Sequence, residues 1–179
     1  KEKLRQLIIA EFHGYEYDEH LRTLIEDYKV GNIILFTRNI KDLDQLITLN
    51  KKIFNEVEKH TGNIPFITID QEGGMVTRIQ DCATFCPGNM TLTATNNSDN
   101  AYRIGKIMGD ELSHLGINMN LAPSLDVNNN PDNPVIGVRS YSDNPKTVSE
   151  YGNKYIKGLQ EKGVIATAKH FPGHGDTNV

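Results

Sequence analysis

Short apolar runs alternate with longer stretches of helical periodicity along the chain. In the stretch that begins at about Asp42, apolar residues recur at every third or fourth position, so they share one helical face, and Gly62 is placed to end the helix. Three more helices are predicted, over 19–28, over 99–115 and over 145–162, the last of which starts with a proline that suits a first helical position. The apolar face of the Asp42 helix is predicted to comprise Leu43, Leu46, Ile47, Ile53, Phe54 and Val57.

The apolar runs themselves predict strands. Strands that alternate with helices indicate βαβ units and a parallel sheet. Two architectures contain such units, an open doubly wound sheet and a (β/α)8 barrel. A whole barrel usually needs ~250 residues, so on the second interpretation the 179 residues supply about the first five of eight strands. The predicted strands lie at 7–10, 31–36, 65–70, 117–121 and 164–170, with loops at 71–98 and 128–134.

The positions of the polar residues favour the barrel. Asp70, Asp126, Lys169 and His170 all fall at or near the C-terminal ends of predicted strands. A barrel assembles its active site from several strand ends on that face. We therefore predict that residues 1–179 form the N-terminal portion of a single catalytic (β/α)8 barrel of the α/β class, whose C-terminal strands are missing from the sequence.

Composition and charge narrow the functional classes. The chain is 37% hydrophobic and 23% charged, which is ordinary for a soluble globular protein, and no window approaches the ~20 apolar residues of a membrane span. The net charge of −4 comes without a basic stripe, so no nucleic-acid partner is predicted. Cys82 and Cys86 are interpreted as two free thiols in a loop, because His170 and His174 lie too far along the chain for a compact zinc site. No metal site and no cofactor are predicted.

Two charged residues stand out before the last strand. Asp70 closes an apolar strand and precedes a turn of Gln, Glu and two glycines, where it could accept hydrogen bonds from two sugar hydroxyls or act as a catalytic carboxylate; its structural alternatives are a helix N-cap or a buried ion pair with Arg78. Arg139 offers a planar fork of five donors, which suits a bidentate grip on hydroxyls or a carboxylate. Its structural alternative is an ion pair with Asp126 or Asp143.

The segment 169–177, KHFPGHGDT, is the most informative in the chain. A lysine and a histidine at a strand end precede a loop rich in proline and glycine, which lacks the third glycine of a dinucleotide fingerprint and the Lys-Ser/Thr pair of a phosphate-binding loop. His174 and Asp176 have the residue types of a base and its orienting carboxylate. Two positions apart on a glycine-rich loop, they are equally well explained as loop scaffolding.

Five motifs, in this order, resemble the family-3 glycoside hydrolases. Within that family they are similar to the bacterial β-N-acetylglucosaminidases that recycle or remodel peptidoglycan. The run Phe-Pro-Gly-His-Gly after Lys169 and His170 distinguishes this branch, because the β-glucosidase branch usually has a loop built around Asn and Glu at that point. The motifs are ILFTRN (34–39), IDQEGGMVTR (69–78), LAPSLDVNNNP (121–131), NPVIGVRSY (133–141) and KHFPGHGDT (169–177).

The resemblance implies a (β/α)8 barrel that hydrolyses terminal N-acetyl-β-D-glucosaminides, derived from peptidoglycan or chitin, with retention through a glycosyl-enzyme intermediate. It implies an Asp-x-His acid/base pair just beyond Thr177 and a nucleophilic aspartate near a later strand end, both outside the 179 residues. His174 matches the histidine inside the motif rather than the acid/base, so the His174–Asp176 pair is disfavoured as a catalytic dyad. The residues implied to bind the N-acetylglucosamine ring are Asp70, Arg78, Arg139, Lys169 and His170.

Two explanations are left for the early end of the chain. The favoured one is a longer protein, in which the downstream segment of the same barrel is the partner that completes the site, because half a barrel leaves two open sheet edges. The other is a short, non-catalytic sugar-binding protein. A family-3 β-glucosidase is the alternative within the enzyme class. On the favoured explanation, the isolated residues 1–179 are expected to be inactive.

Overall fold

A computed structural model describes residues 2–81 and 83–178, and these form one parallel sheet with helices between its strands. Each strand pairs with the next one along the chain, so the sheet order is β1-β2-β3-β4-β5. The predicted parallel order is therefore confirmed, and the strand order shows none of the reversal that a doubly wound sheet requires. The strands are β1 (Ile9–Ala10), β2 (Asn32–Leu35), β3 (Ile67–Ile69), β4 (Met119–Asn120) and β5 (Ile165–Ala166).

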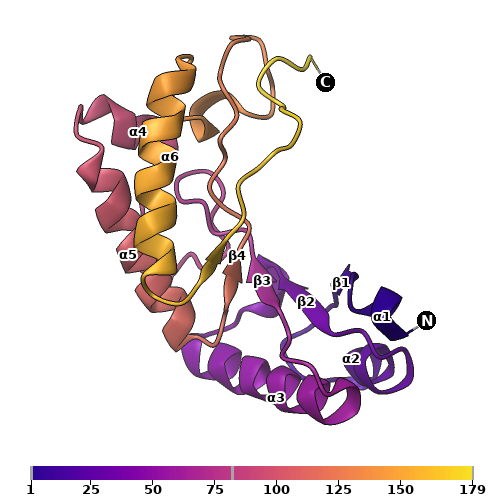
Figure 1. Ribbon diagram of the computed structural model, residues 1–179. Helices are drawn as coiled ribbons and strands as arrows, with labels where there is room; N and C mark the ends of the chain where they lie inside the picture. Colours follow the sequence, from indigo (N-terminus) through magenta and orange to yellow (C-terminus); the bar gives the residue numbers. More distant parts are fainter. Residues whose placement is uncertain (1, 82, 179) are drawn as a thin grey trace.

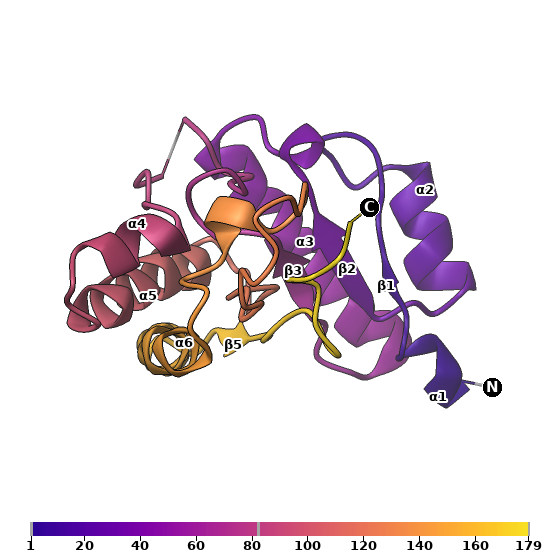
Figure 2. The ribbon, with the colours of Figure 1, turned by 90° about the horizontal axis from the view of Figure 1, so that it is seen from above.

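The helices lie beside the sheet in the same order as the strands that they connect, as Figure 2 shows from above. The short α1 (Glu2–Arg5) precedes β1, and every later α-helix lies in a connection between two strands. In Figure 1 the segments that follow β4 and β5 run from the strand ends to the top of the view, whereas α3 lies at the bottom. No helix in the described part of the chain has the length and apolar character that a membrane crossing requires. The connecting helices are α2 (Glu19–Arg22), which continues into the π-helix η1 (Thr23–Asp27), then α3 (Leu43–Thr61), α4 (Asn89–Ala94), α5 (Asp99–His114) and α6 (Pro145–Gln160), with 3-10 turns η2 (Thr37–Asn39) and η3 (Gly137–Arg139).

Both ends of α3 and the start of α6 lie where the sequence predicts them, whereas α6 ends two residues earlier than predicted, at Gln160. The Asp42 carboxylate accepts a hydrogen bond from the Gln45 N–H at 2.8 Å, and Gly62 takes the left-handed conformation that ends the helix, with a φ of 70°. The Asn144 side chain caps α6 by accepting from the Lys146 N–H at 2.9 Å. Each of these capping contacts joins residues that are close in sequence, so the helix ends that they fix can be predicted from the sequence.

The buried face of α3 differs from the predicted one. Ile47, predicted to be in the core, is 40% exposed, whereas Asn50 and Glu56 are buried. Asn50 is buried because its side-chain amide donates to the Leu115 carbonyl at 2.8 Å, which satisfies the last turn of α5. The buried face of α3 was predicted incorrectly from the apolar residues alone. A polar residue that is buried against another element has the same appearance in the sequence as an exposed one.

A helix, α4, lies inside the segment that was predicted to be a loop. It has only 6 residues, which is too short for helical periodicity to show. Its first residue, Asn89, is buried and donates to the Arg139 carbonyl at 2.7 Å. The helix therefore connects the loop after β3 to the loop after β4.

All five strands are shorter than predicted, and in β3 and β4 asparagine amides replace part of the backbone ladder. Asn118 accepts from the Ile67 N–H at 2.9 Å and donates to the Pro65 carbonyl at 2.8 Å. Asn120 makes the same pair of bonds with the N–H and carbonyl of Gln71, at 3.0 and 2.8 Å. These bridges bind β3 to β4 at both ends, so the turn after β3 starts from a fixed position.

Helices α5 and α6 pack with their backbones in close approach. A side chain at Gly105 would meet the Tyr155 carbonyl, and one at Gly158 would meet the Tyr102 carbonyl. A side chain at Gly109 would meet the Leu159 carbonyl. The three glycines therefore set the distance between these helices.

Candidate functional site

Charged side chains from the ends of β3 and β5 meet at one edge of the sheet. Lys169, which follows β5, places its Nζ 2.7 Å from Asp70 Oδ1, and Asp70 follows β3. The Lys169 carbonyl accepts from the Leu125 N–H at 2.7 Å, which continues the pairing of β4 and β5 toward this edge. The structure therefore brings together two of the predicted residues that lie far apart in sequence.

The turn after Asp70 is held rigidly by the Gln71 side chain. Its Oε1 accepts from the Arg78 N–H at 2.7 Å and from the Ile79 N–H at 3.2 Å, while its backbone is paired with Asn120. Gly73 has a φ of 91° and its backbone packs against that of Pro87, so no side chain fits there. The turn consequently aims Arg78 back toward Asp70, with 3.7 Å between the guanidinium and Oδ2.

Arg78 has donor capacity that the described residues leave unused. Its Nε is buried and has no hydrogen-bond partner among them, and its guanidinium carbon lies 5.6 Å from the centre of the Phe36 ring. A buried N–H that lacks a partner is uncommon in a native fold. The guanidinium of Arg78 therefore keeps unused donor capacity close to Asp70.

Glu72 is the centre of the charged cluster, and the sequence analysis did not single it out. Its side chain is only 3% exposed. The carboxylate lies 2.6 Å from Lys169 Nζ and accepts two bonds from Arg139, at 2.8 and 3.0 Å. The only sequence signal was its place between Asp70 and two glycines, because both partners are distant along the chain.

Arg139 pairs with Glu72 rather than with Asp126 or Asp143, the partners considered from sequence. The hydrogen bond to Glu72, followed by the attraction of nearby carboxylates, raises the pKa of Arg139 against the effect of burial. A further N–H of its fork donates to the Val135 carbonyl at 3.2 Å. Three of the guanidinium N–H donors of Arg139 are therefore bonded within the protein. The side chain stabilises the fold, whatever else it binds.

Replacing Arg139 by alanine in the full-length protein should lower the free energy of unfolding by about 3 kcal/mol, because one partner of a buried ion pair is lost. Lys169 still contacts Glu72, which keeps the loss near the lower end of the range for such pairs. Urea unfolding measures the effect. The double variant Glu72→Gln/Arg139→Ala is the control and should recover part of the loss, since no unpaired charge is then buried. A single variant as stable as wild type would contradict a structural role for the pair.

A second cluster surrounds Asp126, whose side chain is 1% exposed. Burial favours the neutral form of this carboxyl, but hydrogen bonds from the His170 ring, the His174 N–H and the Ser124 hydroxyl outweigh it and hold its pKa below the ordinary value. His170 Nδ1 lies 2.6 Å from Asp126 Oδ2. Because the carboxylate accepts, we assign a ring proton to Nδ1.

His174 and Asp176 do not form a side-chain pair in this structure. His174 Nδ1 lies 2.5 Å from the Thr177 hydroxyl, and the His174 N–H donates to Asp126 Oδ1 at 2.7 Å. Asp176 is exposed, and its backbone carbonyl accepts from Asn130 at 3.4 Å. The loop is therefore built on Asp126 and Thr177.

Two open cavities flank these clusters. One, of about 510 Å³, is lined by Asp126, Lys169 and His170 together with the loop after β5. The other, of about 430 Å³, lies on the far side of Glu72 and Arg139 and has Met75, Phe85 and Val138 among its lining residues. The first cavity is lined by polar and apolar groups in similar measure, whereas the second is mainly apolar.

Cys86 contributes its backbone carbonyl to this edge of the sheet, by accepting from the Gly74 N–H at 2.9 Å. Cys86 is a free, buried thiol, and burial, followed by the charge of Glu111, raises its pKa to about 11. Such a thiol is a poor nucleophile at neutral pH. Cys82 lies outside the described residues, so the sequence interpretation of two free thiols is tested only at Cys86.

Comparison with known proteins shows which family the sequence of this chain resembles. The model of the Glycosyl hydrolase family 3 N terminal domain matches residues 1–179. The chain is 44% identical over 164 residues to Beta-hexosaminidase A of Pseudoalteromonas piscicida, across 89% of this chain and 27% of that protein. It is 38% identical to a Beta-hexosaminidase of Photobacterium profundum, across 90% of this chain and 47% of that one.

Solved structures agree with the sequence comparisons. A glycoside hydrolase family 3 β-N-acetylglucosaminidase from Paenibacillus sp. str. FPU-7 superposes with a TM-score of 0.96 at 48% identity, over 100% of this chain and 34% of that one. NagZ from Neisseria gonorrhoeae, solved in complex with N-trifluoroacetyl-D-glucosamine, gives a TM-score of 0.86 at 32% identity, over 94% of this chain and 50% of that one. The chain thus spans about half or less of the length of these relatives, and its sheet corresponds to the first five strands of their barrel.

Proposed function

Because the chain belongs to glycosyl hydrolase family 3, we propose that the protein it is part of hydrolyses terminal N-acetyl-β-D-glucosaminides. Relatives named β-hexosaminidase and β-N-acetylglucosaminidase support this substrate class. We further infer that the natural substrate is derived from peptidoglycan or chitin, the polymers that supply such sugars.

The observation that carries the proposal is the cluster at the ends of β3 and β5. Asp70 presents a carboxylate beside Lys169, and Arg78 adds a buried donor without a partner among the described residues. One acceptor between two cations can bind adjacent hydroxyls of a pyranose ring and fix their orientation. Hydrogen bonds of this kind are worth several kcal/mol in glycosidases when they strengthen at the transition state.

The other ring-binding residues have supporting roles in this proposal. His170, oriented by Asp126, offers Nε2 to a hydroxyl that donates. Arg139 acts through the donors that remain after it has bound Glu72 and Val135. Lys169 bridges Asp70 and Glu72, so it both binds and positions.

The bond-breaking groups are proposed to lie beyond residue 179. In retaining hydrolysis a nucleophilic aspartate attacks the anomeric carbon while an acid protonates the leaving oxygen, and the same group then activates water. We propose that this acid/base is a histidine paired with an aspartate on the continuation of the loop after β5. The residues within the chain bind the ring and exclude water from it.

The full-length protein should cleave an aryl N-acetyl-β-glucosaminide with a kcat/KM at least ~100-fold above that for the matching aryl β-glucoside, since a site built to bond an amide rejects analogues that lack it. Steady-state release of the aryl alcohol from both substrates measures the ratio. Loss of both activities in the Asp70→Asn variant is the control that assigns them to this site. Comparable values for the two substrates would instead place the protein with the family-3 β-glucosidases.

A further inference from the structure

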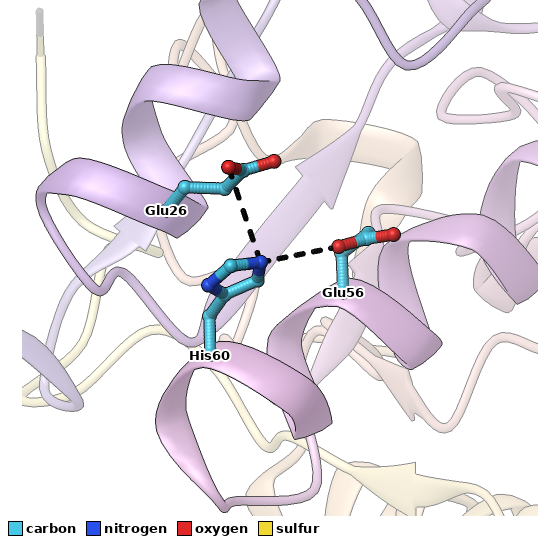
Figure 3. A group of neighbouring side chains, drawn as sticks. All are labelled: Glu26, Glu56 and His60. Carbon is cyan, nitrogen blue, oxygen red and sulfur yellow. Dashed lines mark ion pairs between the residues drawn. The ribbon is translucent and has the colours of Figure 1, made fainter.

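A third cluster of ionisable side chains lies between η1 and α3, away from the sites of Glu72 and Asp126, as Figure 3 shows. Glu56 and His60 stand one turn apart on α3, and Glu26 reaches them from η1. His60 Nε2 lies 3.3 Å from Glu56 Oε2 and 3.9 Å from Glu26 Oε2. One atom from each of the three residues falls within 4.8 Å of the others.

The cluster is largely buried, and its imidazole makes no hydrogen bond through Nε2 in the described part of the chain. The side chains of Glu56, His60 and Glu26 are 11%, 20% and 26% exposed. His60 Nε2 is inaccessible to solvent and makes no hydrogen bond to the described residues, although it points at both carboxylates. A buried nitrogen of this kind calls for a partner, because unpaired buried polar groups are costly.

The distances fit a small metal ion. Ligand atoms held ~2.1 Å from a tetrahedral zinc ion lie ~3.4 Å from one another, close to the 3.3 Å between His60 and Glu56 and slightly shorter than the 3.9 Å between His60 and Glu26. An i, i+4 pair on one helix face is a spacing that zinc sites use. We propose that Glu26, Glu56 and His60 bind a divalent cation of the zinc class, which joins η1 to α3.

Zinc is favoured over calcium or magnesium because of the ligand types. The harder cations take oxygen ligands almost exclusively, whereas zinc accepts an imidazole together with carboxylates. Three protein ligands with a water in the fourth position make a common zinc geometry.

Two lysines compete with the ion for Glu56. Lys52 and Lys59 place their Nζ atoms 2.7 and 3.2 Å from its two oxygens. Their side chains are 50% and 66% exposed, so both can turn into water when a cation enters.

The place of the cluster suggests a structural role. The cluster lies near the end of α3, which stops at Thr61 before β3 begins at Ile67, so it is near the N-terminal ends of the strands. The sugar-binding cluster follows the C-terminal ends. Residues at the N-terminal face of such barrels serve stability. The proposed ion therefore holds the first two strand–helix units together and takes no part in hydrolysis.

The test uses the full-length protein, freed of metal by a chelator and titrated with zinc chloride by calorimetry, with cobalt absorption as a second readout of tetrahedral coordination. Glu26→Gln and His60→Gln should each lose one zinc equivalent, or bind it at least ~100-fold more weakly, as expected when a ligand is removed. Glu58→Gln, an exposed change on the same helix, is the matched control and should bind as wild type does. Lys52→Gln should bind zinc more tightly, because a competing cation is gone.

Thermal unfolding gives a readout that is independent of activity. Zinc should raise the unfolding temperature of wild type, Glu58→Gln and Lys52→Gln, but not that of the two ligand variants. Equal zinc stoichiometry and affinity in wild type, Glu26→Gln and His60→Gln would overturn the proposal, as would a wild-type protein that binds no zinc. If a ligand variant fails to fold, the Lys52→Gln protein decides, since weaker or unchanged binding there contradicts a site at Glu56.

Discussion

Replacing Asp70 by asparagine in the full-length protein should lower kcat/KM for an aryl N-acetyl-β-glucosaminide by at least ~100-fold, or roughly 3 kcal/mol of transition-state stabilisation. The carboxylate accepts from Lys169 at 2.7 Å and stands 3.7 Å from Arg78. The Asp70 carboxylate can accept charge-assisted hydrogen bonds from two hydroxyls, whereas an asparagine offers only one neutral acceptor oxygen. Charge-assisted bonds are about twice as strong as neutral ones. Steady-state kinetics on purified protein measures the loss.

The variant should fold normally, which separates binding from stability. Asparagine has nearly the shape of aspartate, and Lys169 retains Glu72 at 2.6 Å when Asp70 loses its charge. Asp44→Asn, an exposed change on α3, is the matched control and should be kinetically silent. If Asp70→Asn keeps near-normal kinetics, Asp70 serves only as a structural partner of Lys169, and the proposed ring contact is wrong.

Residues 1–179 prepared alone should show no measurable hydrolysis and no sharp unfolding transition. The proposed acid/base and nucleophile lie outside this segment, and β1 and β5 each pair on one side only in the described structure. Ile9 and Ile165 in these strands are 41% and 40% exposed, so apolar surface remains uncovered along with unpaired backbone groups. Activity assays and thermal unfolding by circular dichroism test both expectations.

Co-expression with the downstream segment is the control for that experiment. It should restore a compact particle, together with hydrolysis if the catalytic loop is intact. A monomeric segment that unfolds cooperatively would show that it folds independently. Turnover by that monomer would contradict the assignment of the chemistry to later residues, and His174 with Asp176 would then become the leading candidates.

Much of the fold follows from local signals in the sequence. The caps at Asp42 and Asn144 and the glycine after α3 act within a few residues, so the helix ends were predictable. The alternation of apolar runs with helices was sufficient for the parallel order of the sheet. Where β3 and β4 stop was less predictable, because Asn118 and Asn120 replace ladder bonds with side-chain bonds to another strand.

The candidate site was predictable only in part, for a related reason. Asp70, Lys169 and His170 stand at strand ends, and a parallel sheet gathers strand ends at one edge. Glu72 was missed because its role depends on partners from two other loops. The burial of Asn50 and Glu56 was not predicted, because a polar residue on a helix looks exposed until its partner is known. Contacts between distant residues are what a single sequence conceals.

The glycine contacts between α5 and α6 limit how this barrel can be recombined with others. Gly105 and Gly109 on one helix and Gly158 on the other leave no space for a methyl group at the interface. A chimera that takes α5 from one parent and α6 from another would keep the fit only if both parents supply glycine at matching positions. A crossover point placed before Asp99 or after Gln160 moves the pair as a unit, together with β4 and the Asp126 segment between them. The helix pair and this part of the site would therefore be inherited together.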